Sequence, residues 1–181
     1  AGELTVGNNC HVYVGPTDDG SFIKTVAKSA HIARINTTHI TSGQSACLAF
    51  ALKKEERSKL RRGMVVLMES PTATREFDAE ICILKGEGTT IRKSYQAYLH
   101  ILNVRQTAFV KSIEILNNNA TGLPPSLRAH NDDDDGIVLR PGSRAKVRFQ
   151  FAQRPEYVRP GMRILFRDGR IRGVGLVTGV P

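Results

Sequence analysis

Apolar and polar residues alternate in short runs along most of the chain, and this is the period of a β-strand rather than of a helix. Turn residues separate the runs and recur roughly every eight to twelve positions, a spacing typical of sandwiches and barrels. We therefore predict an all-β chain. The expected strands occupy residues 4–14, 22–35 (two short strands), 45–52, 64–68, 77–84, 95–102, 107–116 and 144–151.

The C-terminal residues 158–180 predict a tight hairpin. An apolar run at 162–166 is followed by Asp168-Gly169, and a second apolar run returns at 171–177. Asp-Gly is a strong signal for a two-residue turn, because a type I′ turn needs positive φ at both central positions. Arginines surround the turn, so the hairpin should carry a cationic rim.

Three other segments interrupt the strand pattern. Residues 53–62 (KKEERSKLRR) predict one or two turns of charged surface helix, closed by Gly63. Ser70-Pro71-Thr72 predicts a domain boundary, with domains at 1–70 and 71–181. Residues 117–136 are rich in Asn, Pro and Asp, so we expect a disordered loop there.

Two pairs of segments repeat at nearly the same offset along the chain. ITSGQSACLAF resembles LRPGSRAKVRF, and LRRGMVVL resembles VRPGMRIL. The first pair aligns Gly43 with Gly142, and the second aligns Gly63 with Gly161. The repeat predicts two β domains with the same turn-then-strand order; a single large sandwich is the alternative.

The net charge, the cysteine count and the length of the apolar runs limit the functions that this chain can have. The net charge of +9 over 181 residues is typical either of a solvated basic surface or of a protein that binds a polyanion, usually nucleic acid. The three cysteines form no C-x-x-C pair, so we expect free thiols in a reducing, cytoplasmic compartment. No apolar run reaches membrane-spanning length, and no membrane partner is expected.

Catalytic motifs are absent from the sequence. It contains neither the phosphate-binding loop G-x-x-x-x-G-K-[ST] nor the nucleophile motif G-x-S-x-G. The five histidines fall at no metal-ligand spacing, and the acidic run at 132–135 lacks the EF-hand pattern. We predict no enzymatic activity and no bound metal for these residues.

The basic residues near the C-terminus are the most informative chemical feature. Residues 137–181 contain ten Lys and Arg against two acidic residues. Arg144, Lys146 and Arg148 alternate with apolar residues, so a strand would carry all three cations on one face. Arg170 and Arg172 repeat this alternation around Ile171. Arginine suits phosphate contact, because its planar fork engages two oxygens.

Three segments resemble elongation-factor-Tu-like translational GTPases, and in detail the branch of GTP-binding proteins one and two. They are residues 43–66, residues 94–110 (SYQAYLHILNVRQTAFV) and the hairpin LFRDGRIRGVG. The resemblance spans essentially the whole chain except 117–136. It implies two consecutive β-barrels, the second and third domains of that family, at 1–70 and 71–181. It also implies binding of tRNA or other RNA at the ribosome.

The resemblance assigns RNA-binding residues in the third barrel, where relatives hold the tRNA backbone. The matching positions lie in the RQT strand and in the terminal hairpin. Where relatives have an acidic contact in their aminoacyl pocket, this chain has His39. Together with the basic residues found by alternation, the predicted RNA-binding set is Tyr98, Arg105, Thr107, Arg144, Lys146, Arg148, Arg167, Asp168, Gly169 and Arg170.

The resemblance further implies a carboxy-terminal fragment, because the family's GTP-binding domain and the opening hairpin of its second barrel would precede Gly2. We therefore expect no cofactor here, while GTP and magnesium would bind the absent domain of a parent GTPase. The first barrel is expected to be incomplete, or to be completed by a neighbouring chain.

Two functions are consistent with this sequence. The first is a non-catalytic module that binds tRNA or other RNA and docks on the ribosome. The alternative is a protein-interaction module that packs on its own GTP-binding domain or on other protein partners.

Overall fold

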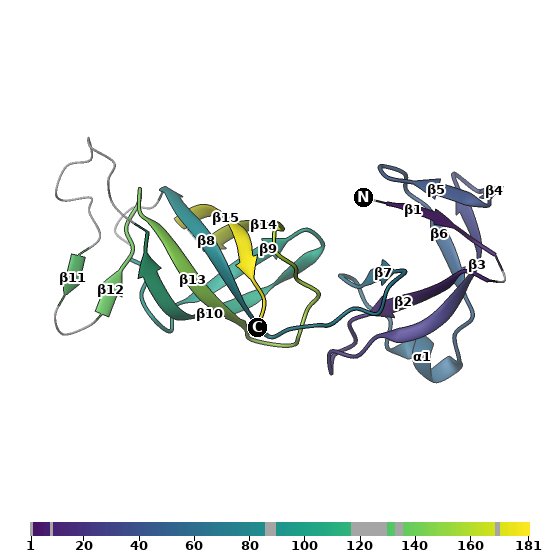
Figure 1. Ribbon diagram of the computed structural model, residues 1–181, viewed down its shortest axis with the longest axis horizontal. Coiled ribbons are helices and arrows are strands. Elements are labelled where there is room, and N and C mark those ends of the chain that lie inside the picture. Colours follow the sequence, from purple (N-terminus) through teal and green to yellow (C-terminus); the bar gives the residue numbers. More distant parts are fainter. Residues whose placement is uncertain (1, 8, 86–89, 117–129, 133–135, 169–170) are drawn as a thin grey trace. The chain divides into compact units, whose positions relative to one another are not determined.

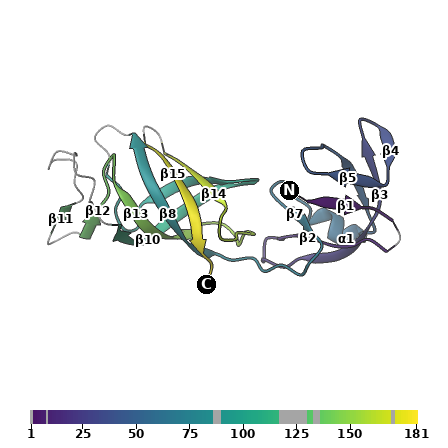
Figure 2. The ribbon, with the colours of Figure 1, turned by 45° about the horizontal axis from the view of Figure 1, so that its top comes forward.

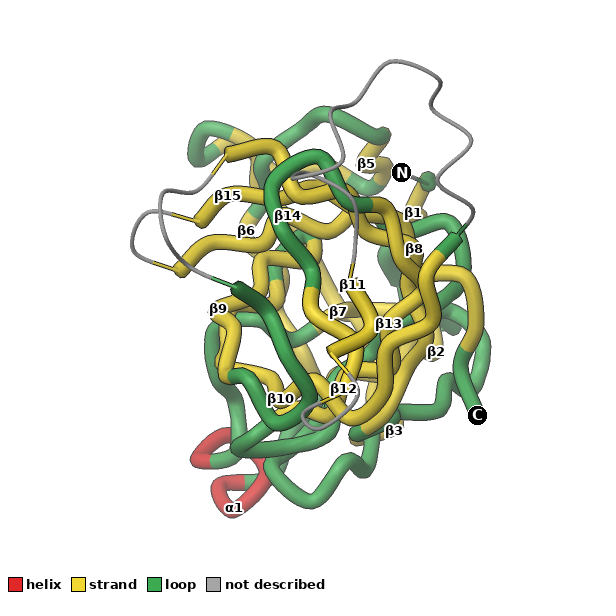
Figure 3. The backbone as a smooth tube through the Cα atoms, turned by 90° about the vertical axis from the view of Figure 1, so that its left-hand side faces the viewer, coloured by secondary structure: helices red, strands yellow, loops and turns green. Residues whose placement is uncertain are grey.

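The computed structural model describes residues 2–7, 9–85, 90–116, 130–132, 136–168 and 171–181. Strands make up most of these residues, and α1 is the one helix in the described part (Figure 1, Figure 3). The chain divides into two compact units, Ala1–Thr72 and Ala73–Pro181.

The described residues of the first unit form seven strands and one short helix. Strands β2 and β3 form the centre of its larger sheet, which has the order β4-β3-β2-β7 with β6 also paired to β3, whereas β1 and β5 pair separately. The elements are β1 Glu3–Thr5, β2 His11–Gly15, β3 Ile23–Ile32, β4 Ile35–Thr37, β5 His39–Thr41, β6 Cys47–Phe50, α1 Lys54–Ser58 and β7 Val65–Leu67.

The described strands of the first unit form open sheets rather than a closed barrel. Its buried core is small and consists of Val6, Val12, Val14, Ala27 and Ala30, with partly buried neighbours around them. The two-barrel prediction is therefore confirmed for one barrel, and the residues described in this unit close no second one.

Two local expectations in the first unit were wrong. Two short strands were expected within residues 22–35, but a single ten-residue strand, β3, fills most of this range. The chain turns only after β3, at Ala33 and Arg34, whose φ values are 49° and 70°. The helix ends at Ser58 and does not reach Gly63, since it buries no residue and a single turn gains little on its own. Lys53 N donates to Glu56 Oε2 at 2.7 Å and caps its first turn.

The second unit contains a closed barrel of six antiparallel strands in the order β10-β13-β8-β15-β14-β9 (Figure 2). This confirms one of the two expected barrels, the one in the C-terminal part of the chain. A separate strand pair, β11–β12, stands outside it. The strands are β8 Glu76–Lys85, β9 Gln96–Ile101, β10 Val104–Ile115, β11 His130–Asp132, β12 Gly136–Val138, β13 Arg144–Phe151, β14 Arg163–Asp168 and β15 Ile171–Gly179.

Alternating inward side chains fill the barrel. Phe77 packs against Phe149 and Phe151, with ring centroids 5.5 and 5.1 Å away, and all three are fully buried. Strand β15 lies close to β8 because of its glycines. A Cβ at Gly175 would come within 2.6 Å of the Glu80 carbonyl oxygen, so only glycine fits without movement of the backbone.

A buried polar cluster fastens the loop after β13 to β10. The amide Nε2 of Gln106 donates to Glu156 Oε1 at 3.1 Å and to the Arg154 carbonyl at 3.2 Å. Its Oε1 accepts from the backbone N–H groups of Gln153 and Arg154. Gln106 and Glu156 are both 3% exposed, so these bonds replace water that the two side chains cannot reach.

The internal repeat is visible in the backbone. Gly43 and Gly142 have φ values of 89° and 88°, and Gly63 and Gly161 have 94° and 87°. Each of the four lies in a turn shortly before a strand, namely β6, β13, β7 and β14. The turn-then-strand order inferred from the repeat is thus confirmed in both units, since all four positions need the left-handed conformation that glycine adopts freely.

The expected disordered loop at 117–136 can be checked against the structure only in part. Most of the predicted disordered loop, residues 117–129 and 133–135, lies outside the described residues. Within it, β11 pairs with β12, so this part was wrongly predicted to lack structure. Backbone pairing does not depend on the acidic side chains that suggested disorder.

Candidate nucleic-acid interface

The structure places the described members of the predicted RNA-binding set on two different outer faces of the barrel. Arg144, Lys146 and Arg148 project from β13, beside β8 and β10. The other members lie on the side formed by β10, β9 and β14. Gly169 and Arg170 lie outside the described residues, and Asp168 is described by its backbone alone.

The alternation predicted for β13 is confirmed, because its exposed and buried residues alternate. The cations on this face have acidic neighbours, however. Arg148 Nε and Nη2 donate to the two carboxylate oxygens of Asp78 at 2.8 and 3.0 Å. Arg144 Nη2 donates to Glu80 Oε1 at 3.1 Å. We call this set, with Lys146 and Glu114, the paired face.

Lys146 completes the paired face. Its register partners are Glu80 on β8 and Glu114 on β10. Opposite charges in register on one sheet face attract each other. A small hollow of about 110 Å³ lies over this face, lined by Asp78, Ser112, Glu114, Lys146 and Arg148. The β13 cations are therefore largely matched within the barrel itself.

The pairing has an effect on titration. Hydrogen bonds from Arg148 lower the pKa of Asp78, and its charge and that of Lys146 lower the pKa further. A carboxyl whose folded-state pKa is depressed stabilises the fold above its unfolded pKa, near 3.9. This stabilisation is lost as the pH falls through the folded-state value.

We expect Asp78→Asn to destabilise the barrel by about 1 kcal/mol at neutral pH, the upper range for an exposed ion pair. The difference from the unmodified chain should begin to shrink as the pH falls below the unfolded-state pKa of an aspartate, near 3.9, and should vanish once the pH passes the lowered pKa of Asp78 in the folded chain. Urea denaturation at neutral and acidic pH measures it. A difference that stays constant between the two conditions would contradict the assigned role of the pair.

The titration of a second aspartate does not confuse this comparison. The Asp19 pKa is also lowered, because Thr17 Oγ1 and then the backbone and hydroxyl of Ser21 donate to its carboxylate. Asp19 is unchanged in both proteins, so its contribution to acid sensitivity cancels in the difference.

The remaining predicted residues lie together in a cross-strand row. Thr107 on β10 is in register with Tyr98 on β9, which is in register with Arg167 on β14. Arg167 in turn is in register with Arg172 on β15. In the neighbouring row on the same face, Arg105 pairs with His100. We call these six residues the arginine row.

The arginine row has no matching acidic residues in the described part of the chain. Arg105, Arg167 and Arg172 are exposed and form no ion pair with any described residue. Tyr98 is 44% exposed, and its ring packs edge-on against His100 with centroids 5.1 Å apart. The row thus combines unmatched guanidinium groups with an aromatic ring and a hydroxyl, all on a rigid sheet.

Sequence reasoning missed Arg172 and His100 as members of this row. Arg172 was missed because the expected turn at Asp168-Gly169 places Arg170 opposite Arg167. Asp168 ends β14 and is in register with Ile171, so the hairpin connection is one residue later than expected and Arg167 faces Arg172. His100 alternates with Tyr98 on β9 and therefore shares its face.

Other chemistry finds no support in the described residues. They contain no group of three or more His, Cys, Asp and Glu side chains arranged to hold a metal ion. Within the same residues, no helix is both long enough and apolar enough to span a bilayer. Cys10, Cys47 and Cys82 are free thiols.

Comparison with known proteins identifies relatives. The chain is 38% identical over 169 residues to GTP-binding protein 2 of Homo sapiens and to that of Mus musculus, a match that covers 92% of this chain. It is 36% identical over 167 residues to GTP-binding protein 1 of Xenopus laevis. No protein-family model matches it.

These matches cover 24% of each GTP-binding protein 2 and 22% of GTP-binding protein 1. The chain thus spans about a quarter of the length of its relatives. The resemblance found in the residues is confirmed at this level: the chain is homologous to a C-terminal quarter of GTP-binding proteins 1 and 2.

Proposed function

We propose that this chain is a non-catalytic, RNA-binding part of a cytoplasmic GTP-binding protein, and that it holds tRNA or another RNA and docks on the ribosome. The observation that carries the proposal is the arginine row, where Arg105, Arg167 and Arg172 are exposed and unmatched by described carboxylates. The sequence resemblance to translational GTPases supports the same function.

The chemistry of the row favours the RNA backbone over the bases. The guanidinium groups of Arg105, Arg167 and Arg172 lie on β10, β14 and β15 and can each contact a phosphate, because their planar forks fit phosphate oxygens. The Tyr98 hydroxyl and the Thr107 hydroxyl can bond sugar or phosphate oxygens beside them. Contacts of this kind position an RNA without reading its sequence, so we expect little sequence preference.

GTP binding is ascribed to another part of the parent protein. The relatives are named for GTP binding, and this chain lacks the phosphate-binding loop. In our proposal, a separate domain of the parent protein binds GTP and magnesium and hydrolyses the GTP. The 181 residues contribute RNA affinity.

The test is a titration of labelled RNA hairpins with the whole chain, followed by fluorescence anisotropy. Two hairpins of equal length and unrelated sequence should bind alike, with dissociation constants of roughly 1–100 µM at physiological salt. Arg167→Ala should weaken both by about five-fold, since one phosphate contact is lost. Arg148→Ala serves as the matched control, because Asp78 already pairs with the Arg148 guanidinium. It should change the dissociation constant of neither hairpin by more than about two-fold.

Failure of both hairpins to bind would refute the proposal. Equal losses in Arg167→Ala and Arg148→Ala would refute its assignment to the arginine row, because a general charge effect would then explain the binding.

A further inference from the structure

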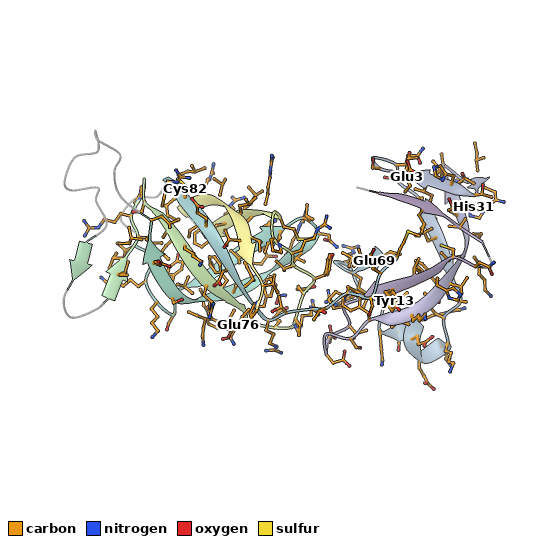
Figure 4. All side chains as sticks on the ribbon, in the orientation of Figure 1. Glu3, Tyr13, His31, Glu69, Glu76 and Cys82 are labelled. Carbon is orange, nitrogen blue, oxygen red and sulfur yellow. The ribbon has the colours of Figure 1, made fainter. Side chains whose placement is uncertain are left out.

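A second feature of the barrel surface is an apolar groove over β8, β15 and β14, which lie side by side (Figure 2). Leu165, Val174 and Leu176 are 57%, 38% and 45% exposed. Leu165 and Val174 are direct register partners, and Val174 is in register with Cys82 on β8, which Figure 4 labels. The groove has a volume of about 520 Å³.

Arginines border this groove. Arg163 lines it and, with Arg167, flanks Leu165 at alternate positions on the outer face of β14. Arg172 stands in the same relation to Val174 on β15. None of the three forms an ion pair with a described residue. The acidic residue in the lining is Glu80, and it is engaged by Arg144.

We propose that this groove binds an acidic amphipathic helix of a partner protein. The aliphatic side chains of the groove would cover the apolar stripe of the helix. Carboxylates on both sides of that stripe would meet the arginines at the border. Charge complementarity therefore defines the partner, because the apolar groove lies within an unmatched cationic border.

The barrel restricts how a partner can dock. Strands β8, β14 and β15 each pair with a neighbour on both sides, so no backbone edge is open for an added strand. Recognition must use side chains, as when a helix lies in a groove with anchors at i, i+3 or i+4 and i+7. A second copy of this chain is a poor occupant, because a two-fold contact would place arginine against arginine.

RNA is also a poor occupant of this groove. Bases bind to surfaces through stacking on aromatic rings, and the three exposed side chains at its centre are aliphatic. The groove adjoins the arginine row and shares Arg167 and Arg172 with it, whereas Arg105 lies on β10, on the other side of β9. Because Arg167 and Arg172 belong to both surfaces, helix and RNA should compete in part.

The experiment uses the whole chain with labelled methyl groups and three synthetic helical peptides of about four turns. All three share one leucine stripe, and their polar faces carry Glu, Gln or Lys. The Glu peptide should shift the methyl signals of Leu165, Val174 and Leu176 and bind about ten-fold tighter than the Gln peptide. The Lys peptide should bind more weakly still.

Two groove variants and two matched controls test the location. Leu165→Ser and Arg163→Glu should each weaken the Glu peptide at least about five-fold. Leu102→Ser, 69% exposed in the turn between β9 and β10, and Lys111→Glu on β10 should leave it unchanged. All four sites are exposed, so thermal unfolding should confirm intact folds.

Three results would overturn the proposal. The first is that the three peptides bind with equal affinity, or that none of them binds. The second is that the Glu peptide shifts methyl signals outside the groove, and the third is that the control variants lose as much affinity for it as the groove variants do. If duplex RNA and not the Glu peptide moves the three methyl signals, the groove belongs to RNA instead. Arg105→Ala, on β10 and outside the groove lining, should weaken RNA binding without weakening the Glu peptide, so either proposal can fail alone.

Discussion

Replacing Arg105 and Arg167 together by glutamate should lower the affinity for duplex RNA on the order of 100-fold. The two residues lie on β10 and β14, on either side of β9, and share one outer face. Each substitution removes a phosphate contact and adds a repelling carboxylate. Because both side chains are exposed, the barrel should keep its stability, which thermal unfolding will show.

The matched control changes the total charge by the same amount elsewhere. Lys111 on β10 and Arg159 before β14 are also exposed, and their double replacement by glutamate should weaken RNA binding by less than about five-fold. Similar losses in the two double variants would mean that net charge, and not the arginine row, controls the affinity.

Gln106→Leu should destabilise the barrel by about 3 kcal/mol, because a hydrogen bond to a buried charged group contributes about 1.5–3 kcal/mol and other partners are lost with it. The Glu156 carboxylate would lose its 3.1 Å donor. The backbone N–H groups of Gln153 and Arg154 would lose their acceptor. Urea denaturation followed by circular dichroism measures the loss.

Gln96→Leu, an exposed glutamine on β9, is the control for that experiment and should change stability by less than about 0.5 kcal/mol. If Gln106→Leu were equally mild, the buried cluster would not be what holds the loop after β13 to the barrel.

Local features of this fold could be predicted well from the sequence. The period-two pattern marked β13 at its observed bounds, because its alternation of charged and apolar side chains is complete. The paired glycines marked four turns, because positive φ is nearly a glycine property. The turn at Ala33 and Arg34 carries no such signal, and it was missed for that reason.

Features that depend on pairing between distant strands could not be predicted. Nothing local reveals that Arg148 pairs with Asp78 or that Arg144 reaches the carboxylate of Glu80, since strands 60 to 70 residues apart must first be placed in register. The sequence therefore grouped all the cations as one surface. The structure separates a paired face from the arginine row, and the RNA proposal now depends on the second.

The terminal hairpin turns one residue later than the sequence predicted, and this changed which arginines face each other. With Asp168-Gly169 as the turn centre, Arg167 would have faced Arg170. In the structure Asp168 pairs with Ile171, which brings Arg172 opposite Arg167. A shift of one position in a hairpin reassigns every cross-strand partner.

The most direct test of the central claim is the salt dependence of RNA affinity. If Arg105, Arg167 and Arg172 each neutralise one phosphate, the logarithm of the association constant should fall with the logarithm of salt concentration at a slope of about −3. Arg105→Ala with Arg167→Ala should reduce the slope to about −1, whereas Arg144→Ala with Arg148→Ala should leave it near −3. A slope near zero, or one that changes with the paired face and not with the arginine row, would contradict the account.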